Sequence, residues 1–248
     1  MLRPNQDAFG RQLDDFFKGR GGGCEIVERD DGFITTGCGP PLYLAPYKKW
    51  SQSIKKAIRF VRGRVLDIGC GAGRVALHLQ EKGHDVTGID NSPLSIKICK
   101  KRGLKKARAM SITQMGDLPG KFDTIVMFGN NFGLVGSFQR AKRLLKLMYK
   151  KTSDNARIIA ETADPYRTDI PEHLAYHRRN RSRGRMSGQL RIRIRFNKAT
   201  TPWFDYLIVS RDELEKIIEG TGWYVNRYID GPSPSYIMIL EKTPGKKP

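Results

Sequence analysis

The stretch Arg64-Val65-Leu66-Asp67-Ile68-Gly69-Cys70-Gly71-Ala72-Gly73-Arg74 decides the fold class of this chain. A short apolar run contains an acidic residue, three glycines follow at alternate positions, and a segment with helical spacing comes next. Glycine permits a tight turn and lets the backbone approach a ligand closely, while the helix that follows presents free N–H groups at its first turn. The stretch therefore predicts a strand, a glycine-rich turn and a helix that together bind a nucleoside-like ligand.

A second carboxylate, Asp90, ends the next predicted strand, residues 85–90. An aspartate is an acceptor on a short stem, so it can accept both hydroxyl protons of a ribose. The glycine pattern GxGxG after an acidic residue differs from the GxGxxG of dinucleotide binders, and it lacks the lysine of a phosphate-binding P-loop. The turn and Asp90 together therefore indicate a nucleoside site of another kind.

Short apolar strands alternate with helices from residue 64 onward, which indicates a parallel sheet with helices on both faces. Strands are expected at 65–68, 85–90, 107–110, 124–128 and 157–161, and helices at 74–82, 93–102, 138–151 and from about 210. Two closing strands, 224–230 and 236–240, have a short linkage and must be antiparallel to each other. The predicted fold is α/β, doubly wound and Rossmann-like, with a sheet that is mixed at one edge.

Two segments are added to this core. Residues 1–62 are expected to form an N-terminal helical extension or lid, with helices at 7–18 and 47–61. Residues 63–248 form the main domain, in which residues 163–205 are a basic insertion with a short strand at 190–196.

With these residues the chain resembles the class I S-adenosylmethionine-dependent methyltransferase family. The motifs VLDIGCGAGR and VTGID carry the resemblance, which covers residues 60–162 well and the closing strands loosely. It implies a seven-stranded sheet of order 3-2-1-4-5-7-6 with strand 7 antiparallel. It also implies the cofactor S-adenosyl-L-methionine, with S-adenosyl-L-homocysteine as product, and an insertion after strand 5 that caps the substrate opening.

The resemblance assigns roles to individual residues of the cofactor site. The glycines lie under the methionine portion, Asp67 orients the loop or the methionine amine, and Asp90 holds the ribose. Many members carry an aspartate after the third strand for adenine, whereas Ser111 stands at that place here, which leaves adenine recognition open. The predicted cofactor-binding residues are Asp67, Gly69, Cys70, Gly71, Gly73, Asp90, Asn91, Met110, Ser111 and Phe128.

In this family the segment after the fourth strand borders the transferable methyl, and here it reads Phe128-Gly129-Asn130-Asn131-Phe132. Positioning can supply much of the catalysis of methyl transfer, so Asn130 and Asn131 are the predicted catalytic residues that orient the acceptor. The alternative is a turn that favours asparagine for backbone reasons. The predicted substrate-binding residues are Tyr47, Phe132, His173, Tyr176, Arg195 and Trp203.

The same segment excludes two classes of nucleic-acid methyltransferase. It lacks the Asp/Asn-Pro-Pro-aromatic motif typical of enzymes that methylate amino groups of bases. The chain also lacks a cysteine in the Pro-Cys or Thr-Cys context that cytosine C5 enzymes use as a nucleophile. The GNNF element is more similar to that of small-molecule N-methyltransferases.

The formal net charge of +20 favours anionic partners. The first hypothesis is a methyltransferase that acts on a small molecule, which the charge can attract if it is anionic. The second is an RNA methyltransferase whose arginines at 178–185 and in the 190–196 strand track phosphates, and the third is a non-catalytic cofactor-binding protein. A solvated basic face without any such role, and a protein substrate, are further alternatives. The first hypothesis is favoured because no RNA-binding signature is present.

Composition limits the remaining expectations. No apolar run approaches the roughly 20 residues that span a bilayer, and the N-terminus is polar, so a cytoplasmic protein without membrane contact is expected. The four cysteines form no CxxC pair, so no metal site or disulfide framework is predicted, and small buried or incidental residues are expected instead. A monomer or a homodimer is expected.

Overall fold

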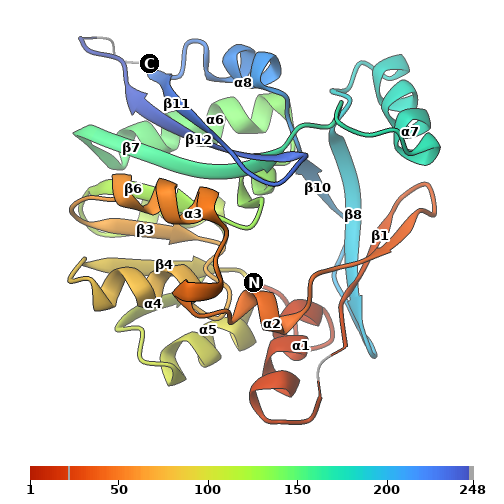
Figure 1. Ribbon diagram of the computed structural model, residues 1–248, viewed down its shortest axis with the longest axis horizontal. Helices are drawn as coiled ribbons and strands as arrows, with labels where there is room; N and C mark the ends of the chain where they lie inside the picture. The colour runs from red at the N-terminus through yellow and green to blue at the C-terminus, as the bar shows by residue number, and fades with distance from the viewer. Residues whose placement is uncertain (22, 246–248) are drawn as a thin grey trace. The chain divides into compact units, whose positions relative to one another are not determined.

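The computed structural model describes residues 1–21 and 23–245. Its larger sheet has the strand order β11-β12-β7-β6-β3-β4-β5 (Figure 1). The strands are β3 (Val65–Ile68), β4 (Val86–Asp90), β5 (Lys106–Ala109), β6 (Phe122–Met127), β7 (Thr152–Ala163), β11 (Trp223–Asp230) and β12 (Ser235–Lys242). β12 runs antiparallel to both of its neighbours, β7 and β11. The predicted α/β fold, its strand order and its antiparallel last strand are confirmed.

The helices that follow the parallel strands are α4 (Arg74–Glu81), α5 (Pro93–Lys101) and α6 (Phe138–Lys150), and α8 (Arg211–Ile218) precedes β11. Three of them begin at a serine, because the hydroxyls of Ser92, Ser137 and Ser210 each accept a backbone N–H of the first turn. α4 differs, since its N-cap is the left-handed Gly73 and no side chain caps its first turn. The positive end of a helix dipole at such a start suits a polar or anionic ligand.

Contacts divide the chain into two compact units. Unit 1 contains Met1–Trp50, Val65–Asp117 and Arg191–Phe204, and unit 2 contains the other described residues. The predicted domain boundary at residue 62 stays a prediction.

Unit 1 holds the N-terminal segment, which has its own strands. α1 (Ala8–Phe17) packs against α5 and is followed by β1 (Ile26–Arg29), β2 (Ile34–Thr36) and the short helix α2 (Pro40–Tyr43). β1 and β2 form an antiparallel hairpin, and β1 also pairs with β8 (Gln189–Phe196). A second sheet of order β10-β8-β1-β2 results, with β10 at Phe204–Leu207 and β9 (Ala199–Thr200) paired to β8 (Figure 1).

In the added segments one helix prediction was wrong and one helix was missed. The expected helix 47–61 is three pieces, the 3₁₀ turn η1 (Tyr47–Lys49), α3 (Gln52–Ala57) and the 3₁₀ turn η2 (Ile58–Phe60). Trp50 has an extended backbone, and the Ser51 hydroxyl then accepts the Ile54 N–H and starts a new helix. The insertion contains a helix, α7 (Pro171–Ser182), that the pattern did not predict because its apolar residues do not recur at helical spacing.

Unit 2 is organised around β6, β7 and the antiparallel pair β11–β12, with α6 packed against α8. The 3₁₀ turns η3 (Ile112–Asp117) and η4 (Asn131–Val135) complete the element order, η3 in unit 1 and η4 in unit 2. Across both described ranges, no helix combines the length and the apolar composition that crossing a membrane requires.

Candidate functional site

The glycine turn between β3 and α4 has the conformation that the motif predicted. Gly69, Gly71 and Gly73 have φ values of 73°, 53° and 83°, in the left-handed region that favours glycine. The Gly69 and Cys70 N–H groups donate to the Ile89 carbonyl at 2.9 and 3.1 Å, which anchors the turn to β4. A Cβ at Gly73 would lie 2.6 Å from the Cys99 sulfur, so this position also has no room for a side chain.

Asp67 lies in β3 beneath the turn. Its side chain is 3% exposed, and among the described residues its Oδ2 has no hydrogen-bond partner. Burial raises the pKa of Asp67 to about 7, with the charge of Asp90 acting in the same direction and that of Arg74 opposing both. A buried, unpartnered carboxylate oxygen suits a ligand that brings a donor or a positive charge.

Asp90 joins the end of β4 to the glycine turn. Its Oδ2 accepts the Gly71 N–H at 3.0 Å, and its Oδ1 accepts the Ser92 N–H at 2.9 Å. Burial raises the pKa of Asp90 to about 6, although the two N–H donors lower it, and the charge of Asp7 raises it further. The two carboxylates and the three glycines that the sequence singled out therefore lie together in unit 1.

Asp7 is a contributor that the sequence analysis missed. Its carboxylate is buried, accepting the Gly10 N–H at the start of α1 and the Leu94 N–H at the start of α5, both at 3.0 Å. A Cβ at Gly10 would lie 2.3 Å from the Ser92 hydroxyl oxygen, so α1 approaches α5 closely at this point. An aspartate before a helical pattern is a recognisable N-cap, but its second bond to a distant helix has no local signal.

The other predicted cofactor residues of unit 1 are engaged in different ways. The Met110 N–H donates to the Asp90 carbonyl at 2.8 Å, which places Met110 beside the ribose-binding candidate. The Ser111 hydroxyl lies 3.0 Å from the Thr113 hydroxyl. Asn91 is exposed, and its carbonyl accepts the Leu2 N–H.

The Cys70 side chain is buried against β4. Its thiol is buried and donates to the Gly71 carbonyl at 3.8 Å, and a Cβ at Gly88 would lie 2.9 Å from the Cys70 sulfur. Only the Cys70 backbone is left to face a ligand. That Cys70 binds the cofactor stays a prediction, and it concerns the backbone atoms of Cys70.

Asn130 and Asn131, the predicted catalytic residues, lie in unit 2 where β6 passes into η4. Asn130 has a left-handed backbone, its carbonyl accepts the Tyr206 hydroxyl, and its Oδ1 is buried without a partner among the described residues. A Cβ at Gly133 would lie 2.3 Å from the Tyr206 ring, so Tyr206 packs directly on this turn. The backbone explanation for asparagine applies to Asn130, and its side-chain oxygen is nevertheless available as an acceptor.

Glu161 also lies at this edge of unit 2, and the sequence analysis did not select it. Its Oε2 accepts the Gly129 N–H at 2.6 Å, which ties the end of β7 to the end of β6. Burial, followed by the Glu161 charge, raises the pKa of Tyr206 and keeps that phenol protonated. A lone glutamate near the end of a strand carries no sequence signal for such a role.

The predicted aromatic residues are mostly packed within their own units. Phe128, Phe132 and Tyr176 of unit 2 are 4%, 1% and 2% exposed, so their side chains are buried. In unit 1, Tyr47 stacks on His78 with ring centroids 4.4 Å apart. The Nδ1 of His173, in unit 2, lies 3.2 Å from the Thr168 hydroxyl.

Arg195 and Trp203 belong to a cluster in unit 1 centred on Glu28. Arg193 makes two hydrogen bonds to the Glu28 carboxylate, at 2.7 and 2.9 Å, and Arg195 approaches it at 3.2 Å. The Arg193 guanidinium lies over the Trp203 ring, 4.6 Å from its centroid. The hydrogen bonds of these two arginines lower the pKa of Glu28, so the carboxylate is ionised and offsets part of their charge.

Within the part of the chain that the structure describes, no three His, Cys, Asp or Glu side chains are grouped so that they could hold a metal ion. The charged side chains of the candidate site in unit 1 are the carboxylates of Asp67 and Asp90.

A doubly wound α/β fold, with a glycine turn between β3 and α4 and a carboxylate at the end of β4, defines a nucleoside-binding protein. Residues 65–152 match the family model described as a methyltransferase domain. A crystal structure of an S-adenosylmethionine-dependent methyltransferase from Bacteroides fragilis, in complex with S-adenosyl-L-homocysteine, matches 98% of this chain and 98% of its own, with 23% identity and a TM-score of 0.83. Residues 65–152 therefore belong to the methyltransferase-domain family, and the chain as a whole has the fold of S-adenosylmethionine-dependent methyltransferases.

Two curated relatives show how far the similarity in sequence extends. The chain is 38% identical over 72 residues to the 2-heptyl-1-hydroxyquinolin-4(1H)-one methyltransferase of Mycobacteroides abscessus, covering 27% of this chain and 32% of that protein. It is 31% identical over 83 residues to the ubiquinone biosynthesis O-methyltransferase of Bordetella avium, covering 31% and 34%. The chain spans about a third to about half of the length of the curated relatives that it matches.

Proposed function

We propose that this protein binds S-adenosyl-L-methionine in unit 1 and transfers its methyl group to a small-molecule acceptor. One observation carries the cofactor assignment: the Gly71 N–H is fixed by Asp90, while Asp67 beneath the same turn keeps a buried oxygen without a partner among the described residues. A Cβ at Gly71 would meet only the Phe9 ring, at 3.9 Å, so glycine leaves open space at this point of the turn for a close approach of the cofactor to the backbone. These groups fit a ligand with two ribose hydroxyls and an ammonium group.

In this proposal the carboxylates, the glycine turn and the two asparagines have different roles. Asp90 accepts the ribose hydroxyls, Asp67 orients the turn or the methionine amine, and the glycine backbone supports the methionine portion. The cofactor supplies a methyl group already activated on a sulfonium, so the protein acts mainly by positioning. Asn130 is proposed to orient the acceptor, because its buried Oδ1 can accept a hydrogen bond from an O–H or N–H group. Asn131 is proposed as its partner.

A small-molecule acceptor is supported by the relatives that match the cofactor-binding segment. One of these relatives is named as a methyltransferase of a hydroxyquinolone, and another as an O-methyltransferase of ubiquinone biosynthesis. The RNA hypothesis loses part of its basis, because Arg193 and Arg195 of the basic strand are paired with Glu28. A small molecule is therefore the acceptor class we propose, and cytoplasmic location and oligomeric state stay predictions.

Calorimetric titration with S-adenosyl-L-methionine tests the cofactor site. Asp90→Ala removes the acceptor of both ribose hydroxyls, and hydrogen bonds to a charged group contribute about 1.5–3 kcal/mol each, so affinity should fall at least tenfold. Asp85→Ala changes an exposed aspartate next to the same strand and should leave the affinity unchanged. Unaltered binding by a folded Asp90→Ala protein would disprove the ribose assignment.

The acceptor class is tested separately with a tritium-labelled methyl group. The protein is incubated with labelled cofactor and with the metabolite, RNA or protein fraction of a cell extract. Label is expected in the metabolite fraction alone, and the Asp90→Ala protein should transfer less of it at the same cofactor concentration. Label in RNA or protein would contradict the small-molecule proposal without affecting the cofactor site.

A further inference from the structure

Cys24 and Cys38 are brought opposite each other by the β1–β2 hairpin. The register pairs Ile26 with Thr36, and the Gly37 N–H continues the ladder by donating to the Glu25 carbonyl at 2.8 Å. The next opposed positions are Cys24 and Cys38. The Cys24 sulfur also lies 3.2 Å from where a Cβ of Gly39 would stand, which places it beside the residue that follows Cys38 independently of the register.

The distance between the two cysteines depends on whether they form a hydrogen-bonded or a non-hydrogen-bonded pair of the hairpin. Hydrogen bonds join Arg29 to Phe33 and Gly37 to Glu25, and because hydrogen-bonded and non-hydrogen-bonded pairs alternate along the ladder, the next pair, Cys24–Cys38, is a non-hydrogen-bonded position. At such positions the Cα atoms of an antiparallel pair are about 4.5 Å apart and the side chains point to the same face. Disulfides form across Cα separations of about 4.4–6.8 Å.

On the opposite face of the hairpin, Glu25 is buried and held by hydrogen bonds. The Glu25 side chain is 3% exposed and accepts hydrogen bonds from Gln12 Nε2, at 2.6 Å, and from the Tyr43 hydroxyl. A Cβ at Gly37 would lie 1.9 Å from Glu25, so glycine leaves room for this carboxylate. Because successive side chains alternate, Cys24 and Cys38 lie on the other face, and both are exposed.

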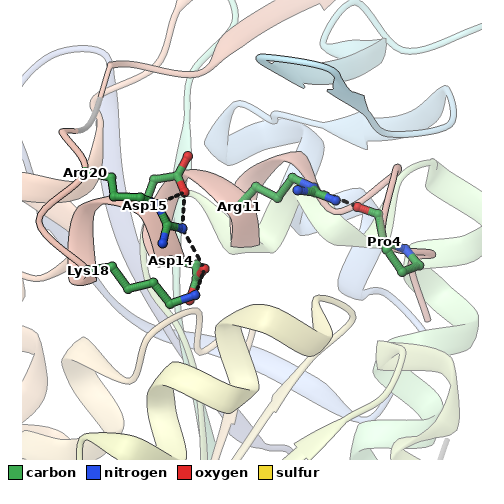
Figure 2. Close-up of polar contacts among 6 residues, drawn as sticks. All are labelled: Pro4, Arg11, Asp14, Asp15, Lys18 and Arg20. Atoms are coloured by element: carbon green, nitrogen blue, oxygen red, sulfur yellow. Dashed lines mark hydrogen bonds and ion pairs between the residues drawn. The ribbon is translucent and has the colours of Figure 1, made fainter.

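Cys24 is accessible to a small reagent. It lines a hollow of about 340 Å³ in unit 1 together with Arg20, Gly21, Gly23 and Arg195. Figure 2 shows that Arg20 is held by Asp14 and Asp15 at the end of α1, so its guanidinium is ion-paired beside the hollow. The pKa of the Cys38 thiol is raised, first by burial and then by Glu25, so Cys38 is the poorer initial nucleophile.

We propose that Cys24 and Cys38 are a dithiol modification site that reacts with a low-molecular-weight disulfide to form a disulfide across the hairpin. The Cys24 thiolate attacks one sulfur of the reagent, breaking its S–S bond and releasing one thiolate. The Cys38 thiolate then attacks the Cys24 sulfur, forming the protein disulfide and releasing the second thiolate. The two protons lost by the cysteines end on the two released thiols, so one disulfide is reduced as another forms.

The buried pair Cys70 and Cys99 provides an internal comparison. Both thiols are buried, so they should stay unreacted under native conditions while Cys24 and Cys38 react. The site is separate from the proposed methyltransferase activity, and its test does not use the cofactor.

Oxidised glutathione and intact-protein mass spectrometry test the site. The reduced full chain should lose two hydrogen atoms, and digestion should yield one linked pair of peptides that contains Cys24 and Cys38. Cys38→Ser cannot complete the second step, so it should retain one glutathione on Cys24. The double variant Cys24→Ser/Cys38→Ser should react with none under native conditions.

Three results would overturn the proposal. A wild-type protein that retains one glutathione on each exposed cysteine would show that the thiols do not meet. Disulfide-linked dimers would show that the disulfide forms between two molecules. A peptide pair containing Cys70 or Cys99 would show that another cysteine reacts. Serine closely matches cysteine in size at these exposed positions, and thermal unfolding of the variants would verify that the hairpin is intact.

Discussion

The affinity for S-adenosyl-L-methionine should fall as the pH is lowered from about 8 to about 5.5. Burial raises the pKa of Asp67 to about 7 and that of Asp90 to about 6, so both groups bind protons in this range. The cofactor offers an ammonium group and hydroxyl donors, which favour the ionised carboxylates, so binding competes with protonation.

The magnitude follows from the two pKa values. At about pH 5.5, roughly one part in thirty of Asp67 and one part in four of Asp90 is ionised, so affinity should be lower by roughly a hundredfold than at about pH 8. Near pH 6.5 binding should release roughly one proton. Without cofactor, the free energy of unfolding depends on pH in the opposite direction. The raised pKa values of both groups stabilise the folded state fully below their ordinary pKa of 3.8, and this contribution is lost as the pH rises to about 7.

Calorimetric titrations in two buffers of different ionisation enthalpy measure both the affinity and the proton release. Asp67→Asn should remove most of the pH dependence, Asp90→Asn a smaller part, and Asp85→Asn none. An affinity that stays constant between about pH 5.5 and 8, with no proton release, would refute the argument that these carboxylates meet the cofactor in their ionised form.

Two further predictions concern the residues around the turn. Asp7→Ala leaves two N–H groups at helix starts without their acceptor, so urea unfolding should show a loss of about 3 kcal/mol, against about 1 kcal/mol for Ser137→Ala, which removes a single cap. Equal losses would contradict the double role of Asp7. Gly73→Ala places a Cβ 2.6 Å from the Cys99 sulfur at a φ of 83°, so the turn must shift. Calorimetry should therefore show weaker cofactor binding. Unchanged binding would show that the turn tolerates a side chain at this position.

The parts of the site that could be predicted from the sequence are those coded locally. The glycines are needed by the backbone of one turn, and Asp90 ends the strand that follows, so spacing alone located them. The strand order follows from the alternation of strands and helices and from the short linker between β11 and β12. In each of these cases the residues that determine the structure are neighbours in the chain.

The parts that could not be predicted depend on partners far away in sequence. β8 joins the N-terminal hairpin through Glu28 and Arg193, which are 165 positions apart, and each strand alone is too short to indicate its partner. The expected helix 47–61 was broken by an extended Trp50 and a serine cap, although its apolar spacing is helical throughout. Asp7 was missed because its second bond reaches a helix 87 positions away.

The shared carboxylate of Asp7 has a consequence for local unfolding. If α1 detaches, the Leu94 N–H loses its acceptor, and if the start of α5 opens, one Asp7 oxygen loses its donor. Neither helix can therefore open without a penalty at the other, so the two belong to one cooperative unit. Since Asp90 and Ser92 stand directly before α5, exchange of the Leu94 amide with solvent reports on the opening of this corner of unit 1.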